Sequence, residues 1–220
     1  MYHNPEYNFI LLASPKTGSE AVQDYLVNLF DNKFDRNYIY LPNEKVKVPN
    51  HTNLAELNNI LASHDLKSVK IISFVRNPYS KAVSSYHYYR QMSVKDIMSS
   101  SNTGAFWKFK FLLKVAFMKL SPFWFYLLLY PLKSNSSYIF DEHTGSKVDY
   151  LGSTASMQED LFSFLRELGY TGELAELERK NSSNHKPWQF YFKSSLSMTI
   201  FKMRNSKELK LYGELFNKVS

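Results

Sequence analysis

The chain has 220 residues, a formal charge of +7 and no cysteine. Its length suits a single domain with its own hydrophobic core, and its positive charge favours anionic partners. The lack of cysteine excludes disulfides, thiolate metal sites and cysteine nucleophiles, and it fits a reducing compartment.

The first structured stretch, residues 9–30, predicts a strand, a tight turn and a helix. The apolar residues 9–13 form too short a run for a helix and are typical of a strand that is buried on both faces. After the turn, apolar residues recur with the spacing of one helical face: Val22, Tyr25, Leu26, Leu29 and Phe30. We expect the unpaired N–H groups of Gly18 to Ala21, the helix dipole and Lys16 to attract a phosphate or sulfate.

The next segment connects this helix to another. Residues 38–41, Tyr-Ile-Tyr-Leu, favour a short strand within a polar stretch. Asn53 and, three residues later, Glu56 predict an N-cap and its capping partner at the start of a helix. His51 therefore lies just before a helix.

Residues 69–75 repeat the plan of strand, turn and helix. This second apolar run predicts a buried strand, and Asn77-Pro78 ends it before another helix. Strands that alternate with helices predict an α/β fold with a parallel sheet, which binds ligands at the carboxyl ends of its strands. Lys16 and Arg76 lie at two such ends.

Two motifs at these strand ends resemble those of sulfotransferases, which use 3'-phosphoadenosine-5'-phosphosulfate (PAPS). Residues 15–19, Pro-Lys-Thr-Gly-Ser, resemble the family's 5'-phosphosulfate loop and differ from a Walker A motif, because the lysine precedes the glycine. Residues 76–86 resemble the 3'-phosphate motif R-x-P-x-x-R-x-x-S-x-Y, with Lys81 in place of the inner arginine. This spacing would let Arg76 and Ser84 grip one phosphate from two sides.

The closer resemblance is to carbohydrate sulfotransferases of the chondroitin, dermatan and HNK-1 type and their bacterial relatives. Four further stretches are similar to segments of that family: residues 51–57, residues 148–152 together with 159–160, residues 181–191, and residues 207–213. The resemblance covers most of the chain, except roughly residues 95 to 135.

This resemblance implies a P-loop-like fold, in which helices flank a central parallel sheet. We expect a single sulfotransferase domain over residues 1–220, with an apolar basic helical insert at about 97–135. The implied reaction moves a sulfuryl group from PAPS to a hydroxyl of a carbohydrate, in a surface glycan or glycolipid precursor. No metal is implied.

The resemblance also implies roles for single residues. Lys16 would hold the 5'-phosphosulfate and stabilise the leaving oxygen, and His51 would be the catalytic base, with His185 as its rival. The implied donor-binding residues are Lys16, Thr17, Gly18, Ser19, Glu20, Arg76, Ser84 and Lys186.

Glu20 departs from the family, whose loops usually carry threonine there. A carboxylate about 4 Å from a bound phosphate would cost roughly 4 kcal/mol at an effective dielectric of 20. Three interpretations stay open: Glu20 turns outward and Ser19 supplies the hydroxyl, Glu20 pairs with Lys16 until the donor arrives, or the protein no longer uses PAPS. The family's glutamate after residues 149–152 is also absent, since Ala155 stands there.

The stretch 105–132 is rich in aromatic residues and leucine, and lysine is its one charged residue type. Its longest uncharged run, residues 120–132, is too short to span a membrane and contains two prolines. Lysines mixed with Trp and Phe favour an anionic membrane surface or an acidic or lipid-linked glycan. A buried helical hairpin or a dimer contact is the structural alternative.

Two further expectations concern location and rival functions. Residues 1–6 leave no room for a secretory leader before the first strand, so we expect a cytoplasmic enzyme, with a peripheral place at the inner face of the membrane as the further option. The main alternative is a degenerate family member that binds a membrane or partner without catalysis. A nucleotide-binding kinase lacks a Walker A lysine here, and the basic residues interleave with leucine and phenylalanine, which argues against nucleic-acid binding. The sequence does not predict the oligomeric state.

Overall fold

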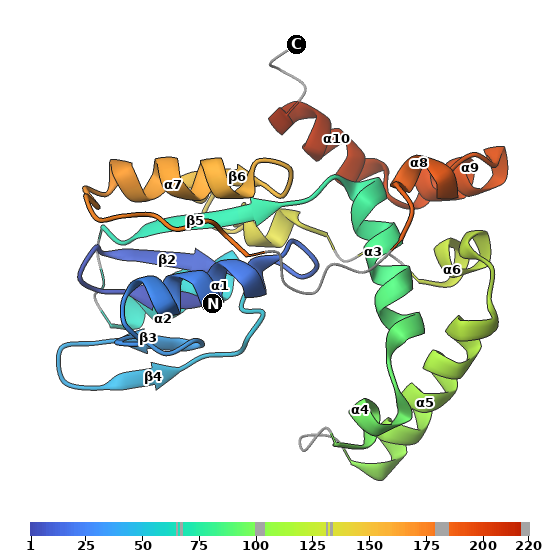
Figure 1. Ribbon diagram of the computed structural model, residues 1–220, viewed down its shortest axis with the longest axis horizontal. Helices are drawn as coiled ribbons and strands as arrows, with labels where there is room; N and C mark the ends of the chain where they lie inside the picture. Colours follow the sequence, from blue (N-terminus) through green and yellow to red (C-terminus); the bar gives the residue numbers. More distant parts are fainter. Residues whose placement is uncertain are drawn as a thin grey trace. The chain divides into compact units, whose positions relative to one another are not determined.

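The computed structural model describes residues 1–64, 66, 68–99, 104–130, 132, 134–178 and 185–216 (Figure 1). The chain divides into two compact units. Unit 1 comprises Met1–Arg76 and Lys133–Ser182, and unit 2 comprises Asn77–Leu132 and Ser183–Ser220. Each unit is described by itself, and the single domain expected from the sequence stays a prediction.

Unit 1 is built on a four-stranded sheet in the order β1-β2-β5-β6. Its strands are β1 (Tyr2–Asn4), β2 (Phe9–Leu12), β5 (Lys70–Val75) and β6 (Tyr150–Ser153). Strands β2, β5 and β6 are parallel, which confirms the predicted parallel sheet, and β1 adds an antiparallel edge that the sequence did not predict. A separate hairpin of β3 (Tyr38–Tyr40) and β4 (Lys45–Lys47) confirms the predicted short strand.

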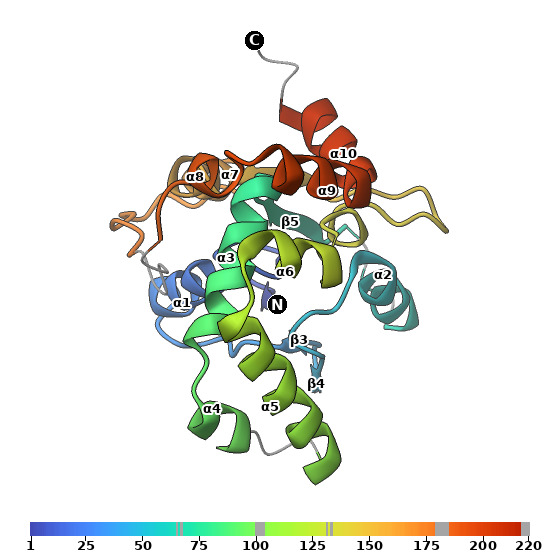
Figure 2. The same cartoon turned by 90° about the vertical axis from the view of Figure 1, so that its right-hand side faces the viewer.

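Helices cover both faces of this sheet, as the two views show (Figures 1 and 2). Helices α1 (Ser19–Leu29) and α7 (Met157–Glu167) pack with Phe9 and Leu11 on one face. Helix α2 (Leu54–Ser63) packs with the alternate residues Ile10 and Leu12 on the other. Because successive residues of a strand point to opposite faces, one apolar run supplies both cores. This is the expected α/β fold.

The start of α2 matches its sequence signature. The Asn53 side chain accepts a hydrogen bond from the Glu56 backbone N–H at 2.9 Å, and the Glu56 carboxylate accepts one from the Asn53 N–H at 3.0 Å. This reciprocal capping box satisfies two of the unpaired donors of the helix and fixes where α2 begins. It thereby also fixes the chain that carries His51 into the helix.

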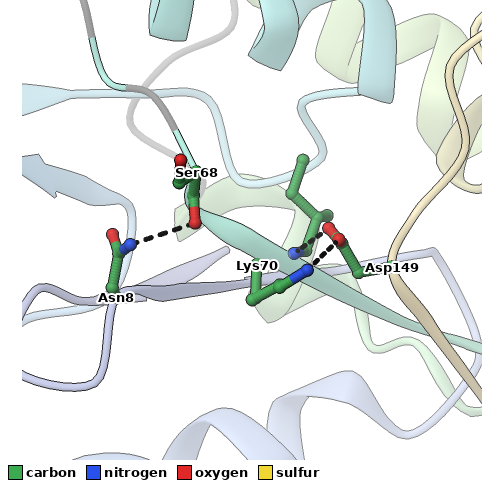
Figure 3. A network of polar contacts seen from close by, with 5 residues as sticks. Asn8, Ser68, Lys70 and Asp149 are labelled. Carbon is green, nitrogen blue, oxygen red and sulfur yellow. Dashed lines mark hydrogen bonds and ion pairs between the residues drawn. The ribbon is translucent and has the colours of Figure 1, made fainter.

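The amino ends of the parallel strands are tied by polar contacts (Figure 3). The Asp149 carboxylate accepts hydrogen bonds from the Lys70 ammonium and from the Ile71 backbone N–H, both at 2.9 Å, and so links β6 to β5. The Asn8 side chain donates to the Ser68 carbonyl at 3.0 Å. Asp149, which lies in one of the family-like segments, therefore holds the edge of the sheet opposite to Arg76.

Unit 2 is helical in the part of it that the structure describes. Its helices are α3 (Pro78–Gln91), α4 (Val94–Ser99), α5 (Ala105–Leu120), α6 (Phe123–Leu129), α8 (Trp188–Tyr191), α9 (Ser195–Arg204) and α10 (Ser206–Phe216). Its core joins α3 with α6 and α9 through Val83, Tyr86, Phe123 and Phe201, all of which are buried. The predicted helix after Asn77-Pro78, the helical insert and the terminal helix are all present.

No helix among the described residues is both long and apolar enough to cross a bilayer. The family-like segment at Asn181-Ser182-Ser183 lies outside the described residues.

Candidate active site

The loop between β2 and α1 is pinned by two of its own hydroxyl groups. Thr17 and Ser19 are both buried, and their hydroxyls donate to the Ser14 carbonyl at 2.8 and 3.2 Å. Their protons are therefore engaged inside the loop. The backbone of Lys16 and Gly18 adopts the left-handed conformation, with φ of 63° and 74°, which gives the loop its tight turn.

Gly18 is the N-cap residue of α1 and is exposed. A Cβ atom at this position would lie 2.7 Å from the terminal methyl group of Met157, a flexible side chain that can move aside, so it is the positive φ that favours glycine here. The Ala21 N–H donates to the Gly18 carbonyl at 3.0 Å. Ala21 therefore does not belong to the group of unpaired donors that the sequence predicted.

Arg76 joins the second strand end to this loop. Its Nη1 donates to the Lys16 carbonyl at 3.3 Å, although the two residues are separated by 60 positions. Burial lowers the pKa of Arg76, yet a guanidinium stays charged at neutral pH. The structure thus brings together the two cations that the sequence placed at strand ends.

Lys16 is half-buried in this cationic setting. Burial lowers its pKa, Glu20 raises it and the nearby Arg76 lowers it, so that the pKa falls from 10.5 to about 8. The Glu20 side chain is exposed on the first turn of α1, where an acidic residue also interacts favourably with the helix dipole. Glu20 is thus turned to solvent and still acts on Lys16 electrostatically. A bound anion would favour the charged lysine in the same way.

His51 lies at the same end of the sheet. Its Nδ1 is 3.2 Å from the carbonyl oxygen of Ala13, the residue that follows β2. Because a carbonyl only accepts hydrogen bonds, this contact assigns the ring proton to Nδ1 and leaves a lone pair on Nε2. The Tyr138 hydroxyl donates to the His51 carbonyl at 3.2 Å and holds the backbone here. A histidine in this tautomer can take a proton at Nε2.

Two residues that the sequence did not single out complete the arrangement. The Thr154 hydroxyl donates to the Val75 carbonyl at 2.9 Å and approaches the Thr17 carbonyl at 3.4 Å, so the chain after β6 holds both strand ends. The buried Asn135 side chain accepts a hydrogen bond from the Ser14 hydroxyl at 3.0 Å. The sequence feature that could have pointed to Thr154 is its hydroxyl just after a family-like segment. No sequence feature pointed to Asn135.

A cavity of about 520 Å³ lies elsewhere in unit 1, between α2 and the chain that enters β5. Leu61, Val69 and Lys147 are among its lining residues. Since Val69 precedes β5 and Arg76 follows it, this cavity lies at the opposite edge of the sheet from Lys16 and Arg76. We assign it no part in the candidate site.

The sequence of the chain matches the model of a known protein family. The model of the sulfotransferase family matches residues 1–213, nearly the whole chain. The chain belongs to the sulfotransferase family. Searches of curated proteins and of solved structures returned no significant match. Members of this family generally use PAPS as sulfuryl donor, and their acceptors are in general sugars or small molecules.

The remaining predicted residues of this sulfotransferase lie in unit 2. Ser84 is half-buried on α3, and Lys81, which replaces the motif's inner arginine, is buried on the same helix. The Lys186 ammonium lies 4.1 Å from the centre of the Phe190 ring. Parts for Ser84 and Lys186 in donor binding stay predictions.

His185, the rival base, belongs to an aromatic cluster of the sulfotransferase. Its ring stacks on that of His87 with centroids 5.2 Å apart, and His87 Nε2 is 2.7 Å from the Tyr191 hydroxyl. Burial lowers the pKa of His87, and the charges of His185 and Arg90 add to this effect. The cluster gives His185 a structural explanation, and the contact of the His51 ring with the Ala13 carbonyl leaves its Nε2 for a proton.

Proposed function

We propose that this sulfotransferase transfers a sulfuryl group from PAPS to a hydroxyl of a carbohydrate. The observation that carries the proposal is the contact between the Arg76 guanidinium and the Lys16 carbonyl, at the carboxyl ends of β2 and β5. It combines two cations with a helix N-terminus, and together these favour a ligand with several negative charges. PAPS is such a ligand, with a phosphosulfate and a separate phosphate.

For the donor, we assign the 5'-phosphosulfate to the loop and the 3'-phosphate to Arg76, and the part of Ser84 rests on the sequence motif alone. The hydroxyls of Thr17 and Ser19 already donate within the loop, so backbone N–H groups rather than these hydroxyls would contact the phosphosulfate. The exposed position of Glu20 supports the interpretation in which its carboxylate stays in solvent. In that case Glu20 does not prevent donor binding.

In the proposed reaction, an acceptor oxygen forms a bond to sulfur while the bond between sulfur and the 5'-phosphate oxygen breaks. The acceptor proton passes to His51 Nε2, and negative charge grows on the leaving phosphate oxygen. Lys16 stabilises this charge as a mobile point charge, and positioning supplies much of the remaining effect. This scheme uses protein side chains alone and needs no metal.

For the acceptor, the resemblance to carbohydrate sulfotransferases supports a sugar hydroxyl, in a surface glycan or a glycolipid precursor. We also propose that the enzyme acts in the cytoplasm, because the absence of cysteine fits a reducing compartment. Both proposals rest on sequence features.

The test is transfer of labelled sulfate from PAPS to a panel of oligosaccharides and polysaccharides. For His51→Gln, we expect kcat to fall about a hundredfold to ten-thousandfold, with unchanged affinity for the desulfated product 3'-phosphoadenosine-5'-phosphate (PAP). His143→Gln removes an exposed histidine from the same unit and serves as the matched control.

His185→Gln distinguishes the rival base. A large loss of kcat in this variant with little change in His51→Gln would overturn the assignment of His51. Transfer in the presence of a strong chelator is expected to continue. PAP binding without transfer to any sugar or small-molecule acceptor would instead favour the non-catalytic alternative.

A further inference from the structure

Helix α5 carries an apolar stripe on its outer side. Its members recur three, four, four and three residues apart, which places them on one helical face. They are Phe106, Phe109, Leu113, Phe117 and Leu120, with exposed fractions of 65, 59, 56, 43 and 88%. Large apolar side chains rarely gather in solvent without a partner.

The opposite side of α5 explains how the helix folds. Val115 and Met118 are buried there, and Met118 joins the core of unit 2. One side of α5 is thus buried when the unit folds, and the packing of the unit gives no reason for the apolar residues of the outer stripe. A buried helical hairpin, the structural alternative for residues 105–132, therefore explains the buried side of α5 and does not explain its exposed side.

The stripe continues onto α6. The rings of Phe117 and Phe125 are 5.5 Å apart, and Trp124, Leu128 and Leu129 on α6 are 39 to 44% exposed. We define the outer face as the stripe on α5 together with these three residues of α6. Its two helices are joined by a short turn at Ser121 and Pro122, so the face has two segments.

The charged residues of α5 and α6 are all lysines. Four lysines lie on α5, at positions 108, 110, 114 and 119, and the sequence has no acidic residue from 97 to 140. The Lys110 ammonium is 4.6 Å from the centre of the Phe106 ring, and the Lys114 ammonium is 4.5 Å from that of Tyr130. The Lys110 ammonium thus lies beside the stripe, whereas the Lys114 ammonium lies against the tyrosine that follows α6.

We propose that the outer face docks onto the surface of an anionic lipid bilayer, with α5 lying in the plane of the interface. Lysines beside Trp and Phe are the composition of interfacial helices, and charge complementarity supplies the preference for anionic lipid. A second copy of this chain fits poorly, because two faces bordered by lysine alone would repel each other. With about 1.5 Å per residue, α5 would lie along the surface over roughly 24 Å.

The test is flotation of the full chain with vesicles of phosphatidylcholine alone and of an equal mixture with phosphatidylglycerol. We expect binding to the mixed vesicles that weakens as salt is added, and little binding to neutral ones. The double variants Phe109→Ser with Leu113→Ser, and Lys110→Glu with Lys119→Glu, should each lower the bound fraction about tenfold or more. All four positions are exposed, so their replacement should leave the fold intact.

Matched controls lie on α9 and α10 of the same unit. Leu196→Ser with Met203→Ser removes two other exposed apolar side chains, and Lys202→Glu with Lys207→Glu reverses two other exposed charges. Both controls should float like wild type. Loss of binding in the controls as well would show a general effect of charge or hydrophobicity and would overturn the proposal.

A second readout follows tryptophan depth in the unaltered protein. Brominated lipids should quench Trp107 and Trp124, and quenching should disappear in the double variant Trp107→Phe with Trp124→Phe, which keeps Trp188. Absence of both quenching and flotation overturns the proposal. So does a dimer in sedimentation analysis that the Phe109→Ser and Leu113→Ser changes abolish while vesicles bind nothing, since the partner is then a second copy.

Discussion

Lys16 is held in a setting that disfavours its charge when the site is empty. Burial and the neighbouring Arg76 lower its pKa to about 8, and its carbonyl is fixed by the Arg76 guanidinium. An anion placed between these cations relieves their repulsion and makes up for lost hydration. The same property that makes the residue costly in the free protein therefore makes it suited to a phosphosulfate.

This electrostatic arrangement predicts that PAP affinity falls as pH rises through about 8, because free Lys16 then loses its proton and must regain it on binding. Calorimetry in two buffers of different ionisation enthalpy should show proton uptake above that pH. Lys16→Met should bind PAP weakly and without this pH step. A constant affinity on both sides of pH 8 would contradict the assignment.

The same pKa shift of Lys16 also makes the free energy of unfolding depend on pH. Because the folded pKa of Lys16 lies below the unfolded value of 10.5, the unfolded chain binds more protons between pH 8 and 10.5. The contribution of Lys16 to the free energy of unfolding therefore rises with pH through that window. Lys16→Met should remove this contribution, as urea unfolding at several pH values would show.

At the residue scale, the sequence predicted Lys16 and Arg76 because charged residues after buried strands meet at one edge of a parallel sheet. It could not predict that the hydroxyls of Thr17 and Ser19 turn inward, since their acceptor, the Ser14 carbonyl, is placed by the left-handed turn itself. The Thr154 hydroxyl also donates to a backbone carbonyl, that of Val75, and the two residues come together only when β5 and β6 pair in the sheet.

At the element scale, the turn that leads β2 into α1 depends on the left-handed backbone of Gly18. Gly18 combines a φ of 74° with a contact that would place a Cβ atom 2.7 Å from Met157. Because the Met157 methyl group ends a flexible side chain and can move aside, we expect Gly18→Ala to lower the free energy of unfolding by about 1 kcal/mol, the cost of the positive φ, and to weaken PAP binding, as denaturant titration and calorimetry would show.

Gly145→Ala is the matched control for this change. Gly145 has a similar φ of 71°, but a Cβ atom there would meet nothing within 4 Å. Gly145→Ala should therefore lower the free energy of unfolding by the backbone strain alone, about 1 kcal/mol. Similar losses in the two variants are expected, because the Met157 methyl group can move aside, and a clearly larger loss in Gly18→Ala that Met157→Ala relieves would contradict this.

Elements were predicted best where local signals agree. The capping pair at Asn53 and Glu56 marks the start of α2, and the apolar runs mark β2 and β5, because burial on both faces needs several consecutive apolar residues. Strand β1 was missed, since Tyr2–Asn4 is short and polar in part, and its place depends on pairing with β2.

At the scale of the whole molecule, the motif of residues 76–86 is divided between the two units, with Arg76 in one and Ser84 in the other. The chain also divides its charge, since the lysines of α5 lie in a stretch without acidic residues. We therefore infer two separate attractions for anions, one at the loop of unit 1 and one at the outer face of unit 2.

The most direct test of the central claim is calorimetric titration of PAP into wild type, Arg76→Ala and Glu20→Thr. Lys33→Ala, which removes a surface lysine paired with Glu6, is the control. We predict micromolar binding to wild type and control, and a loss of about tenfold to a hundredfold in Arg76→Ala, because a charge-assisted contact is removed.

Glu20→Thr should bind PAP at least as tightly as wild type, since it removes a negative charge near the site. Absence of binding in wild type that is restored in Glu20→Thr would contradict donor use by this protein and leave a family member that has abandoned PAPS. Absence of binding in both would contradict the assignment of the site.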